Sequence, residues 1–331
     1  MTTLLIKGVQ IVDGTGRPPF RGDVFVKDKK ISAIGSFGNK DADTVIDGMG
    51  AYAAPGFIDV NTDSDHYLTL FTNPAQREFV FQGVTTVIGG HCGASLAPLL
   101  YGTLESIRKW ADPNQVNVDW HTMGEFLDVL SKKRIGVNFG TLVGHATIRR
   151  ALIGEAFRDL TLNELKVFAQ VVDRAIGEGA LGLSTGLGYA HSNRVPPSEI
   201  VKLLGVVAGH NGVYATHLRD EGLGLVSSVR ETIAAAEKTN VKTVVSHFRP
   251  LLGFEKEYDE ALRVIEGAPV GVRFDCYPFA TSSLALYTLL PPWARDGGLE
   301  VMLSHVKTPA VRERIREEML PVNDQILIIA N

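Results

Sequence analysis

The pattern of hydrophobic and polar positions changes near Pro55 and divides the chain into two parts. Residues 2–54 carry short alternating, β-branched runs separated by turn residues such as Asp13-Gly14 and Asp47-Gly48. Runs of this kind joined by tight turns are typical of antiparallel strands. The pattern predicts a small antiparallel β domain over residues 1–54, too small to be stable alone.

Beyond Pro55, apolar runs of strand length alternate with amphipathic helical stretches. We expect strands at 56–60, 84–89, 137–143, 180–184, 212–216, 242–246 and 271–276. The clearest helices are 161–177, which begins with the capping-box pair Thr161 and Glu164, and 223–239. Repeated strand and helix alternation indicates a parallel sheet, and about seven such units favour a TIM-like (β/α) barrel over an open sheet. The expected fold class is α/β, with one barrel domain over residues 55–331.

An eighth strand is not identifiable at the end of the chain. Residues 308–331 are a charged helical segment followed by the apolar run QILIIAN. We therefore expect an incomplete barrel that lacks its C-terminal part and exposes strand edges and apolar helix faces. The chain would then be a piece of a longer protein, a partner of a complementing C-terminal fragment, or a degenerate protein. A homo-oligomer is a further way to cover such edges.

Composition narrows the function classes. The 331 residues are 45% hydrophobic and 21% charged, which allows a sizeable core. The net charge of −4 gives no basic footprint for nucleic acid or anionic membranes, and no apolar run approaches the length of a spanning helix. Two cysteines, Cys92 and Cys276, are too few for a disulfide framework, so we expect a reducing cytoplasm.

Metal-capable side chains end three of the apolar runs. Cys92 follows GVTTVIGGH, His217 ends GVYATH, and His247 ends VKTVVSH. In a barrel, the functional residues lie at the carboxyl ends of the strands. A thiolate and two imidazoles are a sufficient ligand set for one tetrahedral zinc with an open fourth position, which is the arrangement of a hydrolytic site. The sequence therefore predicts a metal hydrolase.

Several motifs, in order along the chain, resemble those of one family. They are APGFIDV, QGVTTVIGGHCGASLAPL, LVGHATIR, GALGLSTGLGY, THLRDEG, VVSHFRP and DCYPFATSS. Together they resemble the N-acyl-D-amino-acid deacylases, or D-aminoacylases, of the amidohydrolase superfamily. The resemblance implies a barrel joined to a small β-sandwich, one tightly bound Zn²⁺, and hydrolysis of an N-acyl-D-amino acid to a D-amino acid and a carboxylate.

The resemblance also assigns roles to individual residues. It makes Cys92, His217 and His247 the zinc ligands. It places Arg249 where a basic residue would contact the substrate carboxylate. The remaining residues that it places around the substrate are Tyr189, Tyr277 and Ser283.

The sequence departs from the family in two places. The family's first strand ends in an aspartate followed by a histidine pair, whereas here Asp59 is followed by Asn61 and Asp63 at the positions of the pair. Extra histidines, His66 and His91, lie near this region. The family's catalytic aspartate, at the end of a later strand, has no assignable counterpart, which leaves Asp63 as the local candidate for the catalytic acid and base.

Two other interpretations stay open. The losses at the first strand favour a non-catalytic zinc-binding or interaction protein that keeps the fold. A cyclic-amide hydrolase of the dihydropyrimidinase kind would share the barrel. That enzyme needs a bridging modified lysine where this chain has Ser184, which makes this interpretation the weaker one.

Overall fold

The computed structural model describes residues 2–38, 42–154, 156, 158–269, 271–277, 279, 286–295 and 298–319. Two compact units make up the chain, Met1–Phe57 and Ile58–Asn331. The first unit buries a hydrophobic cluster formed by Val9, Ile11 and Val24. The second unit buries larger clusters of its own.

The first unit contains one five-stranded sheet. Its strands are β1 (Thr3–Ile11), β2 (Phe20–Lys27), β3 (Lys30–Gly35), β4 (Thr44–Asp47) and β5 (Tyr52–Ala53). Strands β1, β2 and β3 pair antiparallel, whereas β4 and β5 both pair with β1 in the parallel sense. The predicted antiparallel arrangement is right for the first three strands and wrong for the last two. The turn at Asp47-Gly48 does not reverse the chain, because it carries β4 into β5 along the same neighbour.

The remaining strands, which begin at the boundary of the second unit, follow one another in sequence order. They are β6 (Phe57–Asp59), β7 (Val84–Gly89), β8 (Asn138–Thr141), β9 (Val143–Gly144), β10 (Gly182–Gly186), β11 (Val213–His217), β12 (Lys242–Val245) and β13 (Val272–Phe274). They form a β6-β7-β8 sheet and a β9-β10-β11-β12-β13 sheet, and a single residue joins β8 to β9. The pairings from β7 to β8 and from β9 to β13 are parallel. All seven predicted strand regions are confirmed, with the third split into β8 and β9.

Helices separate most of these strands. They are α1 (Thr69–Thr72), α2 (Arg77–Val80), α3 (Met123–Lys132), α4 (His145–Ile153), α5 (Leu162–Gly177), α6 (Pro197–Gly209), α7 (Leu225–Thr239), α8 (Glu255–Glu266), α9 (Pro292–Arg295), α10 (Gly298–Lys307) and α11 (Pro309–Glu318), with 3₁₀ turns at Glu105–Ile107, Pro113–Gln115 and Leu286–Leu289. The predicted helices correspond to α5 and α7. The capping box of Thr161 and Glu164 starts α5, as the sequence indicated. No helix in the described part of the chain is both long and apolar enough to cross a membrane.

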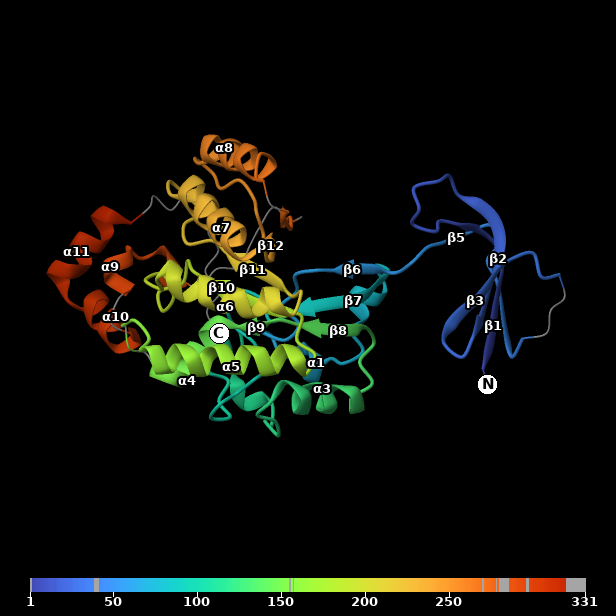
Figure 1. The fold of residues 1–331 in the computed structure, drawn as a ribbon, viewed down its shortest axis with the longest axis horizontal. Helices are drawn as coiled ribbons and strands as arrows, with labels where there is room; N and C mark the ends of the chain where they lie inside the picture. Colours follow the sequence, from blue (N-terminus) through green and yellow to red (C-terminus); the bar gives the residue numbers. More distant parts are fainter. Residues whose placement is uncertain are drawn as a thin grey trace. The chain divides into compact units, whose positions relative to one another are not determined.

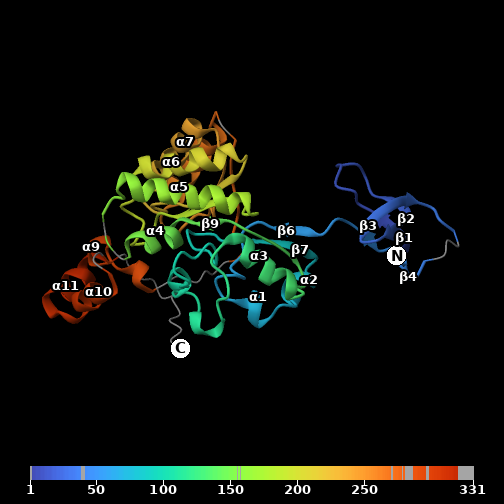
Figure 2. The ribbon, with the colours of Figure 1, turned by 60° about the horizontal axis from the view of Figure 1, so that its bottom comes forward.

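The helices cover the outer face of the parallel sheet. Helices α5, α6 and α7 lie side by side in contact, as Figures 1 and 2 show. They alternate with β10, β11 and β12 along the chain, so each helix returns the chain to the start of the next parallel strand. All these strands therefore end at the same edge of the sheet. This edge carries the candidate functional residues.

Candidate metal centre

Three strand ends bring a thiol and two imidazoles together. Cys92 lies just beyond β7, His217 is the last residue of β11, and His247 lies just beyond β12. Cys92 Sγ is 3.9 Å from His217 Nδ1 and 3.6 Å from His247 Nε2. The candidate ligand atoms of these residues all lie within 4.8 Å of one another. The three residues chosen from the sequence thus form one cluster, while metal binding itself stays a prediction.

The backbone around this cluster is unusual and tightly packed. Cys92 has a φ of 53° and His247 a φ of 42°, in the left-handed region that non-glycine residues seldom adopt. A Cβ atom at Gly186 would lie 2.2 Å from the Cys92 carbonyl oxygen, and one at Gly188 would lie 2.7 Å from His217 Nε2. Both close approaches require glycine, so the TGLG segment that begins in the last residues of β10 is fitted to the two candidate ligands.

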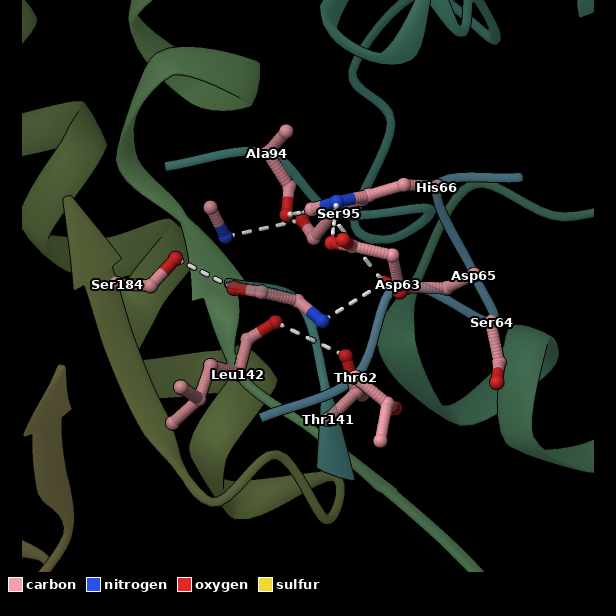
Figure 3. Close-up of polar contacts among 12 residues, drawn as sticks. Thr62, Asp63, Ser64, Asp65, His66, Ala94, Ser95, Thr141, Leu142 and Ser184 are labelled. Carbon is pink, nitrogen blue, oxygen red and sulfur yellow. Dashed lines mark hydrogen bonds and ion pairs between the residues drawn. The ribbon is translucent and has the colours of Figure 1, made fainter. Parts of the chain in front are cut away.

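Buried side chains anchor the loop that carries Cys92. Ser184 in β10 accepts a hydrogen bond from Gly93 N at 3.1 Å and donates one to the Gly90 carbonyl oxygen. Asp65 accepts a 2.7 Å hydrogen bond from Gly90 N. Figure 3 shows Ser184 and Asp65 approaching the loop from opposite sides. Both side chains are fully buried, so the loop is fixed on either flank of the thiol.

Electrostatics favour a thiolate beside protonated or metal-bound imidazole. Burial raises the pKa of the Cys92 thiol, but contacts with His217 and His247 outweigh this effect and lower it to about 6. Burial lowers the pKa of His247, whereas Cys92 and Glu221 raise it, and the net shift is upward. His247 Nδ1 forms an ion pair with Glu221 Oε1 at 3.1 Å. This pairing leaves Nε2 of the same ring directed at Cys92, and carboxylates commonly orient metal-binding histidines in this way.

Residues at the end of β6 are held by other partners. The Asn61 side-chain amide donates to both carboxylate oxygens of Asp275 at 3.1 Å. Asp63 lies 2.9 Å from His66 Nδ1, with its side chain 49% exposed. His91 is buried, and this burial lowers its pKa to about 4, so its ring is neutral at pH 7. The positions of the missing histidine pair therefore carry an amide and a carboxylate that are each engaged elsewhere.

Sequence reasoning missed Asp275, the first residue beyond β13. Its Oδ1 atom accepts a 2.6 Å hydrogen bond from the backbone N of His247. Burial raises the pKa of this carboxyl group more than the hydrogen bonds from His247 and Asn61 lower it. The signal was present in the sequence, because a carboxylate that directly follows an apolar barrel strand lies at the functional edge. Asp275 connects the end of the first barrel strand to the backbone of a candidate ligand.

Of the four predicted substrate residues, the structure describes three. The Tyr189 ring packs against the His217 ring, with centroids 4.7 Å apart. Arg249 follows His247 by two residues, and its guanidinium lies 5.2 Å from the centroid of the Tyr277 ring. Ser283 lies outside the described residues. Tyr189 and Arg249 thus lie close to the two histidines, and Tyr277 adjoins Arg249.

Comparisons with known proteins agree with this arrangement, although no family model matches the chain. D-aminoacylase of Alcaligenes xylosoxydans xylosoxydans is 34% identical over 289 residues, which cover 86% of this chain and 58% of that protein. N-acyl-D-glutamate deacylase of the same organism is 30% identical over 288 residues, or 86% of this chain and 58% of that protein. The chain spans less than two thirds of the length of these curated relatives.

Solved structures of deacylases also resemble this chain. A crystal structure of D-aminoacylase superposes with a TM-score of 0.75 at 32% identity, covering 83% of this chain and 58% of that one. N-acyl-D-glutamate deacylase from Bordetella bronchiseptica, solved with zinc and a phosphonate inhibitor, gives a TM-score of 0.74 at 32% identity and the same coverage. A D-hydantoinase from Thermus shares the fold alone, with a TM-score of 0.53 at 16% identity.

The parallel strands, their covering helices and the candidate ligand cluster at the strand ends define the chain as a member of the amidohydrolase superfamily with a TIM-barrel-type fold. Within that superfamily, the chain is similar to the D-aminoacylase family, with 30–34% identity to three curated deacylases over about 86% of its length. The resemblance read from the sequence motifs is confirmed.

Proposed function

We propose that the protein hydrolyses the linear amide of an N-acyl-D-amino acid in a zinc-dependent reaction, releasing a D-amino acid and a carboxylate. The observation that carries this proposal is the convergence of Cys92, His217 and His247, whose ligand atoms lie within 4.8 Å of one another. N-acyl-D-glutamate deacylase, solved with zinc, shares the fold over 83% of this chain.

The residues present fit one zinc ion. Sulfur and imidazole nitrogen are the ligands that zinc prefers, and a lowered thiol pKa makes the thiolate available near neutral pH. A second ion has less support, because the side-chain amide of Asn61 is turned onto Asp275 and Asp63 is paired with His66. We therefore propose a single zinc site held by Cys92, His217 and His247.

Zinc bound there would polarise the amide carbonyl and make water a better nucleophile. The protein's own groups supply the rest of the chemistry. Arg249 is proposed to hold the substrate's α-carboxylate, since its guanidinium Nε atom is buried and has no hydrogen-bond partner in the described part of the chain. Tyr277 and Ser283 would position the acyl end, and Tyr189 would pack against the substrate beside His217.

Asp63 is the proposed proton acceptor and donor. Burial raises the pKa of this carboxyl group, but His66 outweighs that effect and the net shift is downward, so Asp63 is ionised at neutral pH. An ionised carboxylate is able to take a proton from the attacking water, and such general-base assistance contributes about 10²–10⁴-fold to a rate. Asp63→Asn is therefore expected to reduce turnover while leaving the zinc content unchanged.

The cyclic-amide alternative loses support from the position of Ser184. Its hydroxyl group is committed to Gly90 and Gly93 and does not reach between two metal positions as a bridging carboxylate would. A metal-binding protein without hydrolytic activity is the remaining alternative. The loss of the first-strand histidine pair favours that alternative, and the retained ligand cluster favours the enzyme.

The test measures metal and activity separately. Elemental analysis of the purified chain should give about one zinc per chain, and the double variant Cys92→Ala, His217→Ala should give none. Hydrolysis of N-acetyl-D-amino acids, with the L-enantiomers as controls, then separates the enzyme from the non-catalytic protein. Well-folded chain without zinc would contradict the proposal. Zinc without release of any D-amino acid would support the non-catalytic alternative.

A further inference from the structure

Lys109 is a cation near the cluster of Cys92, His217 and His247, and the proposed function does not use it. It lies in the segment between the 3₁₀ turns Glu105–Ile107 and Pro113–Gln115. Its ammonium nitrogen is 3.1 Å from the centroid of the Tyr189 ring and 3.9 Å from that of Trp110. Among the side chains that the structure describes, no carboxylate forms an ion pair with this ammonium. Its close contacts there are aromatic faces.

The two rings connect Lys109 to the candidate site. Tyr189 packs against the ligand His217 with ring centroids 4.7 Å apart. Trp110 stacks on His66, the partner of Asp63, at 4.1 Å. A single side chain, that of Tyr189, therefore separates Lys109 from His217.

Lys109 is half-buried, with its ammonium held against two aromatic rings, and an ammonium desolvated in this way without a counter-charge is unfavourable. Aromatic faces offset part of the cost of desolvation, but far less than a carboxylate does. Burial lowers the pKa of Lys109 well below its ordinary value, and the negative charges of Cys92 and Asp63 oppose this shift only in part. An anionic ligand close to Lys109 would supply the missing counter-charge.

The other free donor of the site comes from a different direction. Arg249 follows His247 by two residues and lies over the Tyr277 ring, whereas Lys109 lies over the Tyr189 ring, which packs against His217. Two cations approaching from the two histidines match a substrate with two carboxylates. A substrate with an apolar side chain would desolvate Lys109 further without supplying a counter-charge.

We propose that Lys109 binds the side-chain carboxylate of the substrate, so that the protein prefers N-acyl derivatives of acidic D-amino acids, while Arg249 holds the α-carboxylate. This inference rests on the proposed function. Charge-assisted contacts of this kind are strong enough to give a preference of about tenfold or more over a neutral side chain.

Calorimetric binding of two ligands to the zinc-loaded chain tests this preference without requiring turnover. N-acetyl-D-glutamate should bind about tenfold tighter than N-acetyl-D-methionine. Lys109→Met, which keeps the length of the side chain and removes its charge, should abolish that difference and leave the affinity for N-acetyl-D-methionine unchanged. Lys109→Arg should keep most of the preference. Lys132→Met serves as the matched control, because Lys132 is exposed on α3 and pairs with Asp128.

Each outcome separates this inference from the proposed function. Equal binding of the two ligands by the unmodified chain would overturn the role of Lys109 and leave the proposed function standing. Retained preference in Lys109→Met would also overturn it. Failure of both ligands to bind would overturn the proposed function, and this inference with it. Where hydrolysis is measurable, Lys109→Met should raise KM for N-acetyl-D-glutamate with little change in kcat.

Discussion

Ser184→Ala removes the hydroxyl group that fastens the Cys92 loop. In the protein, this hydroxyl accepts a hydrogen bond from Gly93 N and donates one to the Gly90 carbonyl oxygen, and both partners are buried. Alanine fills nearly the same space but makes neither bond. The substitution therefore leaves one backbone donor and one backbone acceptor without a partner on either side of Cys92.

The expected cost follows from these two groups. A buried polar group that loses its partner costs about 1–3 kcal/mol. Two such groups, with some relaxation of the loop, predict a loss of about 2–4 kcal/mol in the free energy of unfolding. Because Cys92 lies between the two anchored residues, we also expect zinc affinity to fall by about 10–100-fold, as for other residues that orient metal ligands.

Urea unfolding of the metal-free chain measures the first effect, and competition with a chromophoric chelator measures the second. Ser131→Ala is the matched control, since the Ser131 hydroxyl donates to a helix carbonyl at an exposed position. The control should change stability by less than about 0.5 kcal/mol. A Ser184→Ala chain with unchanged unfolding and unchanged zinc affinity would refute the role given to Ser184. A loss of stability with unchanged zinc affinity would show that Ser184 supports the fold and not the ligand.

Gly188→Ala should weaken zinc binding because the added methyl group would collide with a ligand imidazole, whereas Gly205→Ala, at an open helix position, should leave zinc binding unchanged. The thiolate absorbance of metal-free Cys92, followed in a Cys276→Ser background, should grow as the pH rises through about 6. A midpoint near 9.0 would show that His217 and His247 do not lower the pKa of this thiol. Burial lowers the pKa of His66, but its neighbouring carboxylates raise it to about 9, so its contribution to stability should be complete below pH 6.5 and disappear as the pH rises through about 9. Urea midpoints across that window should fall in the unmodified chain and change less in His66→Gln.

Local patterns were sufficient to predict the barrel strands. The predicted strand at 84–89 coincides with β7, and the other six predicted ranges each overlap an observed strand. The directions of β4 and β5 were not predictable in this way. The pairing direction depends on how the chain passes from β3 back to β1, and tertiary contacts decide that path. Alternation alone does not distinguish a parallel from an antiparallel partner.

The ligand cluster was predictable for a similar reason. Parallel strands place their carboxyl ends at one edge, so Cys92, His217 and His247 had to lie near one another. The residues that support and surround the cluster were harder to identify. Ser184 contacts Gly93 across 91 residues of sequence, and Asp275 contacts His247 across 28. Nothing in the local pattern around Lys109 shows that it lies over Tyr189, because only the folded chain brings the two together.

The spacing of the ligands along the chain links metal binding to folding. Cys92 is separated from His217 by 125 residues and from His247 by 155. An unfolded chain has no means of presenting these three groups together, so an ion bound to all three would bind only the folded state. Zinc would then stabilise the protein in proportion to the logarithm of its free concentration, and a chelator would act as a denaturant. The metal would in this sense join β7, β11 and β12 much as a covalent cross-link does.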